Sequence, residues 1–236
     1  MYELNHITGN SYYIQSPSKM GLVKLSDTDV CLIDSGNDKD AGRKVRQLLD
    51  ANGWHLTAIY NTHSNADHIG GNRYLQGQTK CRIYAQGIEC DITRHPVLEP
   101  AFLYGGFPPK DLRHKFLMAQ ESDAQELTPA VLPEGFELLQ LPGHFFHMVG
   151  FRSPDDVVYL ADCLSSRERN ALFLCRRGSF LRFPARAPCR PASARIRCAE
   201  GAASRRRRRS VCFCPFLSPP SDIIRQLYSV IIHHIG

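Results

Sequence analysis

Residues 62–71, with the sequence THSNADHIGG, form the most informative segment of this chain. They follow the apolar run 56–60, LTAIY, which is typical of a buried strand. His63, Asp67 and His68 therefore lie together just after that strand, and the closing Gly-Gly pair lets the backbone pass close to whatever they hold. Imidazole nitrogen and carboxylate oxygen are donors that bind zinc and similar divalent ions. The segment predicts a metal site at a strand end.

Two further residues of the ligand type follow apolar strands later in the chain. His144 comes after the run 136–141 and a Pro-Gly pair, and Asp162 comes after the run 157–160. Taken alone, each histidine is an ordinary loop residue, and Asp162 is the N-cap of a helix. Taken together, these residues are candidate metal ligands: His63, Asp67, His68, His144 and Asp162.

The order of these segments resembles the metallo-β-lactamase-fold hydrolases, and their glyoxalase II-like members, over about residues 1–165. That family carries His-x-His-x-Asp-His, then Pro-Gly-His, then an Asp after a strand, then a last His. An early strand ending in Asp-x-Gly is matched by residues 30–36, VCLIDSG. The resemblance implies an α+β fold, a four-layer αββα sandwich. It also implies a hydrolase whose zinc-activated water attacks a carbonyl-type substrate of the thioester, lactone or β-lactam class.

The resemblance also implies the roles of individual residues. Asp67 is the expected catalytic carboxylate, which holds metal and steers a proton, and Asp162 is expected to bridge two ions. Asp34 is expected to orient a metal-binding histidine rather than bind metal itself. The expected cofactor is one or two zinc ions, with iron or manganese as alternatives. The expected partner is a small-molecule substrate.

Two departures from the family pattern weaken the predicted site. Asn65 stands where the first motif has its second histidine, and an amide oxygen is a poorer ligand than imidazole. We expect Asn65 to hydrogen-bond beside the ligands or contact substrate, with a distant ligand as the third option. The last histidine is not found: His233 and His234 resemble it superficially, but the sequence before them is anomalous. A catalytically impaired family member is therefore the first alternative function.

The composition changes abruptly near residue 166. Residues 1–165 carry 14 Lys and Arg against 20 Asp and Glu, whereas residues 166–236 carry 15 Arg, no Lys and three acidic residues. We interpret this Arg- and Cys-rich tail as frameshifted, mis-assembled or disordered sequence. The alternative is a genuine segment, residues 205–209, that binds nucleic acid or an acidic surface. The acidic first 165 residues give no reason to expect a nucleic-acid substrate.

Length and composition favour one domain, residues 1–165, followed by the tail. The N-terminus lacks the pattern of a signal peptide, and no apolar run approaches the ~20 residues that span a bilayer. The expected location is therefore the cytoplasm, without a membrane. Four scattered cysteines, Cys31, Cys81, Cys90 and Cys163, are expected to be reduced, buried thiols. The sequence carries no signal for the oligomeric state.

Hydrophobic periodicity predicts the order of the elements. The expected strands lie within residues 2–15, 20–35, 56–60, 82–85, 136–141, 148–152 and 157–160, and the expected helices cover residues 38–49, 67–75 and 86–94. Residues 96–118 are rich in Pro, Gly and aromatic residues. This insert is either a wall over a pocket or a surface loop that buries its own aromatic rings.

Overall fold

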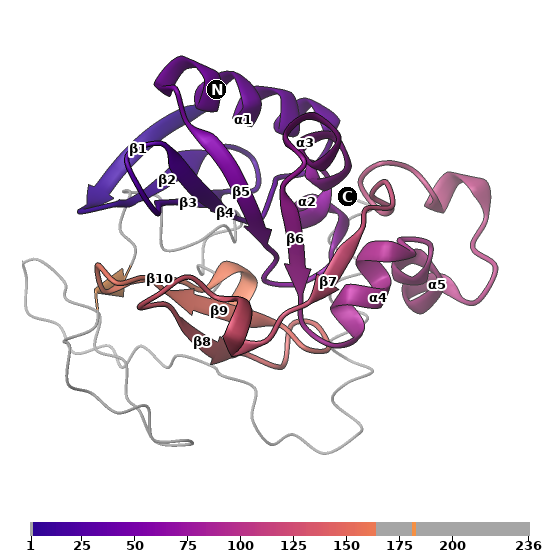
Figure 1. The fold of residues 1–236 in the computed structure, drawn as a ribbon. Coiled ribbons are helices and arrows are strands. Elements are labelled where there is room, and N and C mark those ends of the chain that lie inside the picture. Colours follow the sequence, from indigo (N-terminus) through magenta and orange to yellow (C-terminus); the bar gives the residue numbers. More distant parts are fainter. Residues whose placement is uncertain (1, 164–180, 183–236) are drawn as a thin grey trace, which may run out of the picture. The chain divides into compact units, whose positions relative to one another are not determined.

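The computed structural model describes residues 2–163 and 181–182, and these form two β-sheets with helices beside them (Figure 1). The seven-stranded sheet has the order β1-β2-β3-β4-β5-β6-β7, and the four-stranded sheet has the order β11-β10-β9-β8. The strands of the large sheet are β1 (Glu3–Thr8), β2 (Ser11–Gln15), β3 (Met20–Lys24), β4 (Asp29–Ile33), β5 (His55–Tyr60), β6 (Arg82–Ala85) and β7 (Ala124–Glu126). Those of the small sheet are β8 (Glu137–Gln140), β9 (Val149–Arg152), β10 (Val157–Tyr159) and β11 (Leu181–Arg182).

The connections confirm the predicted α+β class. Strands β1 to β4 form an antiparallel meander, whereas β4 to β7 run parallel and are linked through helices. The helices are α1 (Lys39–Asn52), α2 (Ala66–Ile69), α3 (Asn72–Thr79), α4 (Ile88–Arg94) and α5 (Leu98–Tyr104), with 3₁₀ turns at Lys110–Leu112, Pro129–Val131 and Ala161–Cys163. Helices α1 and α3 cover the outer face of the large sheet (Figure 1). The helical layer expected on the small sheet, and the predicted boundary near residue 165, are not among the described residues.

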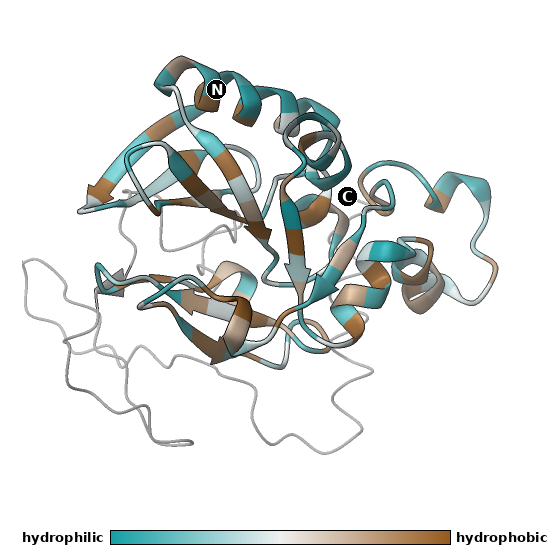
Figure 2. Ribbon diagram, viewed as in Figure 1, coloured by the Kyte–Doolittle hydropathy of each residue, from teal (hydrophilic) through white to brown (hydrophobic). Residues whose placement is uncertain are grey.

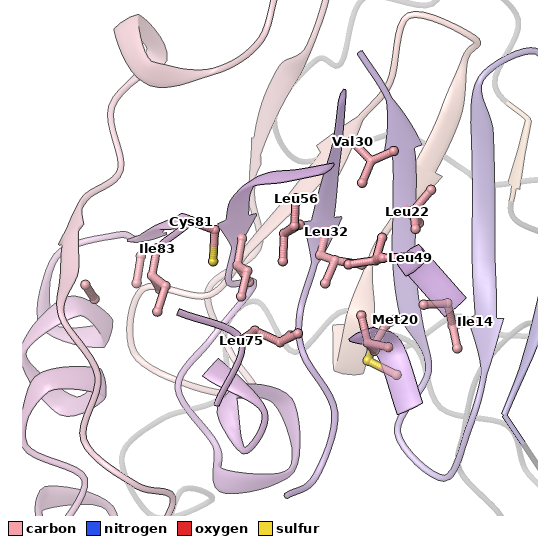
Figure 3. Packing of buried hydrophobic residues seen from close by; sticks show 14 of the residues in the cluster. Ile14, Met20, Leu22, Val30, Leu32, Leu49, Leu56, Leu75, Cys81 and Ile83 are labelled. Atoms are coloured by element: carbon pink, nitrogen blue, oxygen red, sulfur yellow. The ribbon is translucent and has the colours of Figure 1, made fainter. Parts of the chain in front are cut away.

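The apolar side chains of strand β4 pack into both layers of the core, one on each face of the large sheet. Val30 and Leu32 point toward α1 and α3, whereas Cys31 and Ile33 point toward the small sheet. Successive side chains of a strand alternate between its faces, so a strand buried on both faces must be apolar throughout. Figure 2 shows this apolar colouring on the central strands, and Figure 3 shows the cluster under the helices.

Helix α1 begins and ends near the predicted positions. The Asp38 side chain accepts a hydrogen bond of 2.9 Å from the backbone N–H of Ala41, which satisfies one of the free donors at the helix start. Gly53 ends the helix with a φ of 67°, a conformation that favours glycine. Val45 and Leu49 are buried against the sheet, as the amphipathic pattern predicted.

The single helix predicted over residues 67–75 is wrong, because the structure breaks it into α2 and α3. The carbonyl of His68 accepts a hydrogen bond of 2.8 Å from the Ser35 N–H, and the Gly71 N–H donates to Ser35 Oγ. These bonds replace bonds of the helical ladder. A Cβ on Gly70 would lie 2.3 Å from the carbonyl carbon of Asn37. The glycine pair therefore allows close approach to the chain's own backbone after β4, and not to a bound ion as the sequence suggested.

Substituting Gly71 by alanine should lower the free energy of unfolding by about 1–3 kcal/mol, because the new Cβ would lie 2.4 Å from the Ser35 carbonyl oxygen. The matched control is Gly77→Ala, since Gly77 lies within α3 and a Cβ there meets nothing within 4 Å. That variant should gain about 0.5–1 kcal/mol from helix propensity. Urea unfolding of both variants measures the difference, and equal effects would contradict the close approach.

Two smaller predictions concern cysteines and membranes. Cys31, Cys81 and Cys90 are buried thiols outside any disulfide, as predicted, whereas Cys163 is only partly buried, so the prediction of burial is wrong for Cys163. Burial raises the pKa of the Cys31 thiol to about 12. No helix in the described part of the chain has the length and apolar character needed to cross a bilayer.

Candidate metal centre

His63 and His68 lie on the segment that leaves the C-terminal end of β5, and both imidazoles are buried. Their ring centroids are 4.1 Å apart. The Thr62 hydroxyl donates its proton to Asp34, so it accepts from Nδ1–H of His63 at 2.9 Å. His68 Nδ1 lies 2.8 Å from Asp34 Oδ2 and donates to it. Both rings therefore present Nε2 to the space between them.

Asp34, at the end of β4, connects this segment to the neighbouring strand. Its backbone has a φ of 63°, a left-handed conformation that Asp tolerates better than most residues. Its carboxylate accepts bonds of 2.8 Å from the Thr62 N–H and from the Thr62 hydroxyl, besides the bond from His68. Asp34 thus contacts the His68 ring, and its predicted role in orienting a metal-binding histidine stays a prediction.

His144 and Asp162 meet the two histidines from the small sheet. His144 lies in the loop between β8 and β9, and Asp162 follows β10. Ligand atoms of His63, His144 and Asp162 all lie within 4.8 Å of one another. Asp162 Oδ1 is 3.3 Å from His68 Nε2, and Asp162 Oδ2 is 3.4 Å from His144 Nε2. Four of the five predicted ligands therefore converge.

The charges of this cluster are strongly coupled. Burial opposes a charge on His68, but the carboxylates of Asp162, Asp67 and Asp34 outweigh burial and raise its pKa well above the usual range. Burial opposes the charge of Asp162 too, but His68 and the other imidazoles lower its pKa well below the usual range. Burial and the neighbouring His68 lower the pKa of His63. The carboxylates of this cluster therefore concentrate negative charge around the His68 imidazole.

A divalent cation fits this donor set. His63 Nε2, His68 Nε2 and Asp162 Oδ1 are buried and have no hydrogen-bond partner within the described residues, even though the last two are neighbours. Buried polar atoms without partners are costly and rare in folded proteins. Two imidazole lone pairs and a carboxylate oxygen facing one space match the ligands that zinc takes in proteins.

Asp67 and Asn65 lie at the edge of this cluster. Asp67 Oδ2 is 3.6 Å from His68 Nε2 and accepts a bond of 3.0 Å from the Ser18 hydroxyl. The Asn65 amide donates to Glu99 Oε1 at 2.8 Å. Asp67 therefore lies beside His68 Nε2, and its role as a ligand stays a prediction, whereas Asn65 is tied to a residue outside the motif.

The sequence analysis missed Glu89, a buried carboxylate that connects the two histidine loops. Glu89 Oε2 accepts bonds from the N–H and the hydroxyl of Ser64, next to His63. Glu89 Oε1 accepts the N–H of His147, three residues after His144, at 2.8 Å. Burial raises the pKa of Glu89. One side chain of α4 thus bonds to both of the loops that supply ligands.

Glu99 of α5 was also missed, although it fixes the same loop from the insert 96–118. Its Oε2 accepts the N–H of Ala66 at 2.8 Å, beside the bond from Asn65 to Oε1. Burial raises the pKa of Glu99 to about 8. A carboxylate between two prolines in an apolar stretch, VLEPAF, was the available signal, because a buried carboxylate requires donors around it.

Comparison with known proteins agrees with this geometry. The family model described as the metallo-beta-lactamase superfamily matches residues 9–178. A hydroxyacylglutathione hydrolase from Methylococcus capsulatus is 28% identical over 157 residues, which is 66% of this chain and 52% of that protein. One from Nitrobacter hamburgensis is 51% identical over 41 residues, 17% of this chain and 16% of that protein. The chain thus spans about half the length of the Methylococcus relative.

Solved structures show the same fold. A metallo-β-lactamase with a HARLDQ motif from Cronobacter sakazakii aligns with a TM-score of 0.50 and 18% identity, over 66% of this chain and 62% of that chain. A β-lactamase from Chitinophaga pinensis aligns with a TM-score of 0.50 and 20% identity, over 64% and 56%. With a family match over most of its length and two sheets that bring its histidines together, the chain belongs to the metallo-beta-lactamase superfamily.

Proposed function

We propose that this chain is a metal-dependent hydrolase of a carbonyl-type substrate. The observation that carries the proposal is the convergence of His63, His68, His144 and Asp162, with buried ligand atoms that have no hydrogen-bond partner among the described residues. These four residues would hold zinc, with iron or manganese as alternatives. The metal would supply an activated water and would polarise the substrate carbonyl.

The protein groups around the metal position its ligands and handle the proton. Asp34 holds the His68 ring so that Nε2 faces the site. The Thr62 hydroxyl does the same for His63. Asp67 has a half-exposed carboxylate beside His68 Nε2, which suits it to accept a proton from the attacking water.

Thioesters are the first substrate class to test. The curated relatives are named hydroxyacylglutathione hydrolases, and the structural neighbours are named β-lactamases. The first name describes release of an acyl group from glutathione, and an acyl group on a thiol is a thioester. Lactones and β-lactams complete the panel, because they present the same electrophilic carbonyl.

Metal content per chain, measured by plasma mass spectrometry, tests the proposal together with hydrolysis of this panel. We expect about one or two equivalents of zinc, iron or manganese and turnover of at least one class. Turnover should disappear with a chelator and return with the metal. A chain without metal, or a loaded chain that hydrolyses none of the panel, contradicts the proposal.

An impaired family member is the second candidate, and Asn65 favours it. The position that carries imidazole in the family motif donates instead to Glu99 within the described structure. The expected last histidine falls outside the described residues, as does the Arg-rich segment 205–209. Metal binding without turnover is the result that distinguishes this candidate from a working hydrolase.

A further inference from the structure

Exposed apolar side chains are concentrated on two segments of the described chain, the insert 96–118 and the loop that carries His144. Among the described residues, eight large hydrophobic side chains are exposed, and six of them lie on the insert 96–118 or in the His144 loop: Val97, Leu98, Phe102, Phe107, Phe116 and Phe146. Most isolated exposed apolar residues need no explanation, but a contiguous group next to a site marks a binding surface. The concentration of exposed apolar residues on these two segments therefore indicates a binding surface.

Two rings of this group, Phe102 and Phe146, form a connected cluster with the buried Phe145, which reaches the metal centre. Phe102 lies 4.6 Å from Phe146 and 6.1 Å from Phe145, measured between ring centroids. Phe145 and Phe146 are 4.9 Å apart. Phe145 directly follows His144 in the chain, and its ring lies 6.3 Å from that of His63. We call Phe102, Phe145 and Phe146 the phenylalanine cluster.

Glu99 explains why Phe102 lies near Phe145. Glu99 is buried and bonded to Asn65 and to the N–H of Ala66, so α5 is fixed against the loop that carries His63. Phe102 follows Glu99 by three residues, and side chains three apart lie on the same face of a helix. The contact that holds the insert therefore also directs Phe102 toward Phe145. Phe102 as a whole residue is 50% exposed there.

We propose that the phenylalanine cluster is a subsite for an apolar chain or ring on the substrate of the hydrolase. The proposal rests on the proposed function, because the subsite adjoins the metal centre. A half-exposed Phe102 and a partly exposed Phe146 offer new apolar contact area, and Phe145 connects that area to the ligand histidines. The substrate group that binds this subsite is apolar. It can belong either to the acyl part of the substrate or to its leaving group.

Binding of simple carboxylates tests the subsite without any turnover. Calorimetry on the zinc-loaded chain compares octanoate with acetate, which share the carboxylate and differ in the chain. We expect octanoate to bind about 10- to 100-fold tighter, a fraction of the maximum for six buried methylenes. Phe102→Ala should reduce that ratio at least about fivefold and leave acetate unchanged.

Phe107→Ala is the matched control. Phe107 lies on the same insert, is 89% exposed and contacts Arg113, and its loss should leave the ratio unchanged. Equal affinity for the two carboxylates, or an equal effect of both variants, overturns the subsite. A changed oligomeric state of Phe102→Ala with an unchanged ratio would instead identify an interface between copies, and also overturns it.

Kinetics then assign the subsite to one part of the substrate. One thioester series lengthens the acyl chain on a fixed thiol, and the other lengthens the thiol on an acetyl group. The series that uses the subsite should show kcat/KM rising about two- to fourfold per methylene, mainly through KM, with a flatter rise in Phe102→Ala. If no thioester, lactone or β-lactam is hydrolysed but octanoate still binds through Phe102, the proposed function fails and the subsite stands.

Discussion

Replacing Asp67 with alanine is expected to lower the turnover of the metal-loaded chain by about 10²–10⁴-fold, the range typical of a lost general base. Two carboxylates face His68 Nε2, at 3.3 Å from Asp162 and 3.6 Å from Asp67. The Asp162 side chain is only 24% exposed and is shared with His144, whereas the Asp67 side chain is 44% exposed. Asp67 is therefore the carboxylate that water can reach.

Metal content measured in parallel separates loss of the metal from loss of a proton acceptor. Ser18→Ala should have a smaller effect, because it removes only the hydroxyl that holds the Asp67 carboxylate. Asp91→Ala, an exposed carboxylate on α4, is the control that should leave turnover unchanged. Turnover that survives in Asp67→Ala would show that another group takes the proton.

Replacing Glu89 with alanine should weaken metal binding by about 10- to 100-fold, as the loss of groups that orient ligands commonly does. The substitution leaves three donors without their acceptor: the Ser64 N–H, the Ser64 hydroxyl and the His147 N–H. Each buried donor left unpaired costs about 1–3 kcal/mol, so the free energy of unfolding should also fall. A chelator competition for zinc and urea unfolding measure the two effects.

The conservative variant Glu89→Gln should fall between the wild type and alanine, because one carboxamide oxygen can still accept from one loop. The exposed Glu137 of β8 pairs with Arg152 at 3.2 Å, so Glu137→Ala should change stability by less than about 1 kcal/mol and leave zinc affinity unchanged. Lost stability with unchanged zinc affinity would mean that Glu89 supports the fold and not the ligands.

The order of the elements was predictable because each depends on local signals. Strand β6 is apolar through its last three residues. Helix α1 has a capping residue at each end, Asp38 at its start and Gly53 at its end. The break between α2 and α3 was not predictable, because it depends on hydrogen bonds to Ser35, which lies more than 30 residues away along the chain. Periodicity within residues 67–75 contains no information about that contact.

The residues of the candidate site also fall into two groups, those that the sequence predicts and those that it does not. His63, His68, His144 and Asp162 could be found because each follows a strand, and strand ends meet in this fold. Glu89 and Glu99 could not, because each lies on a short helix whose packing against the His63 loop is a tertiary property. The role of Asp67 as ligand or proton acceptor is a prediction that the Asp67→Ala variant tests, and the role of Asn65 stays a prediction.

The three buried carboxylates Asp34, Glu89 and Glu99 have a thermodynamic consequence for metal capture. They bond to the histidine loops within the protein itself, so much of the ordering of those loops is achieved by folding and not by the ion. A site that is ordered in advance loses little conformational entropy when it binds an ion. This preorganisation favours high affinity. If the chain binds an ion as proposed, removal of that ion should leave a folded protein that can bind it again, in contrast to small zinc domains that unfold without their metal.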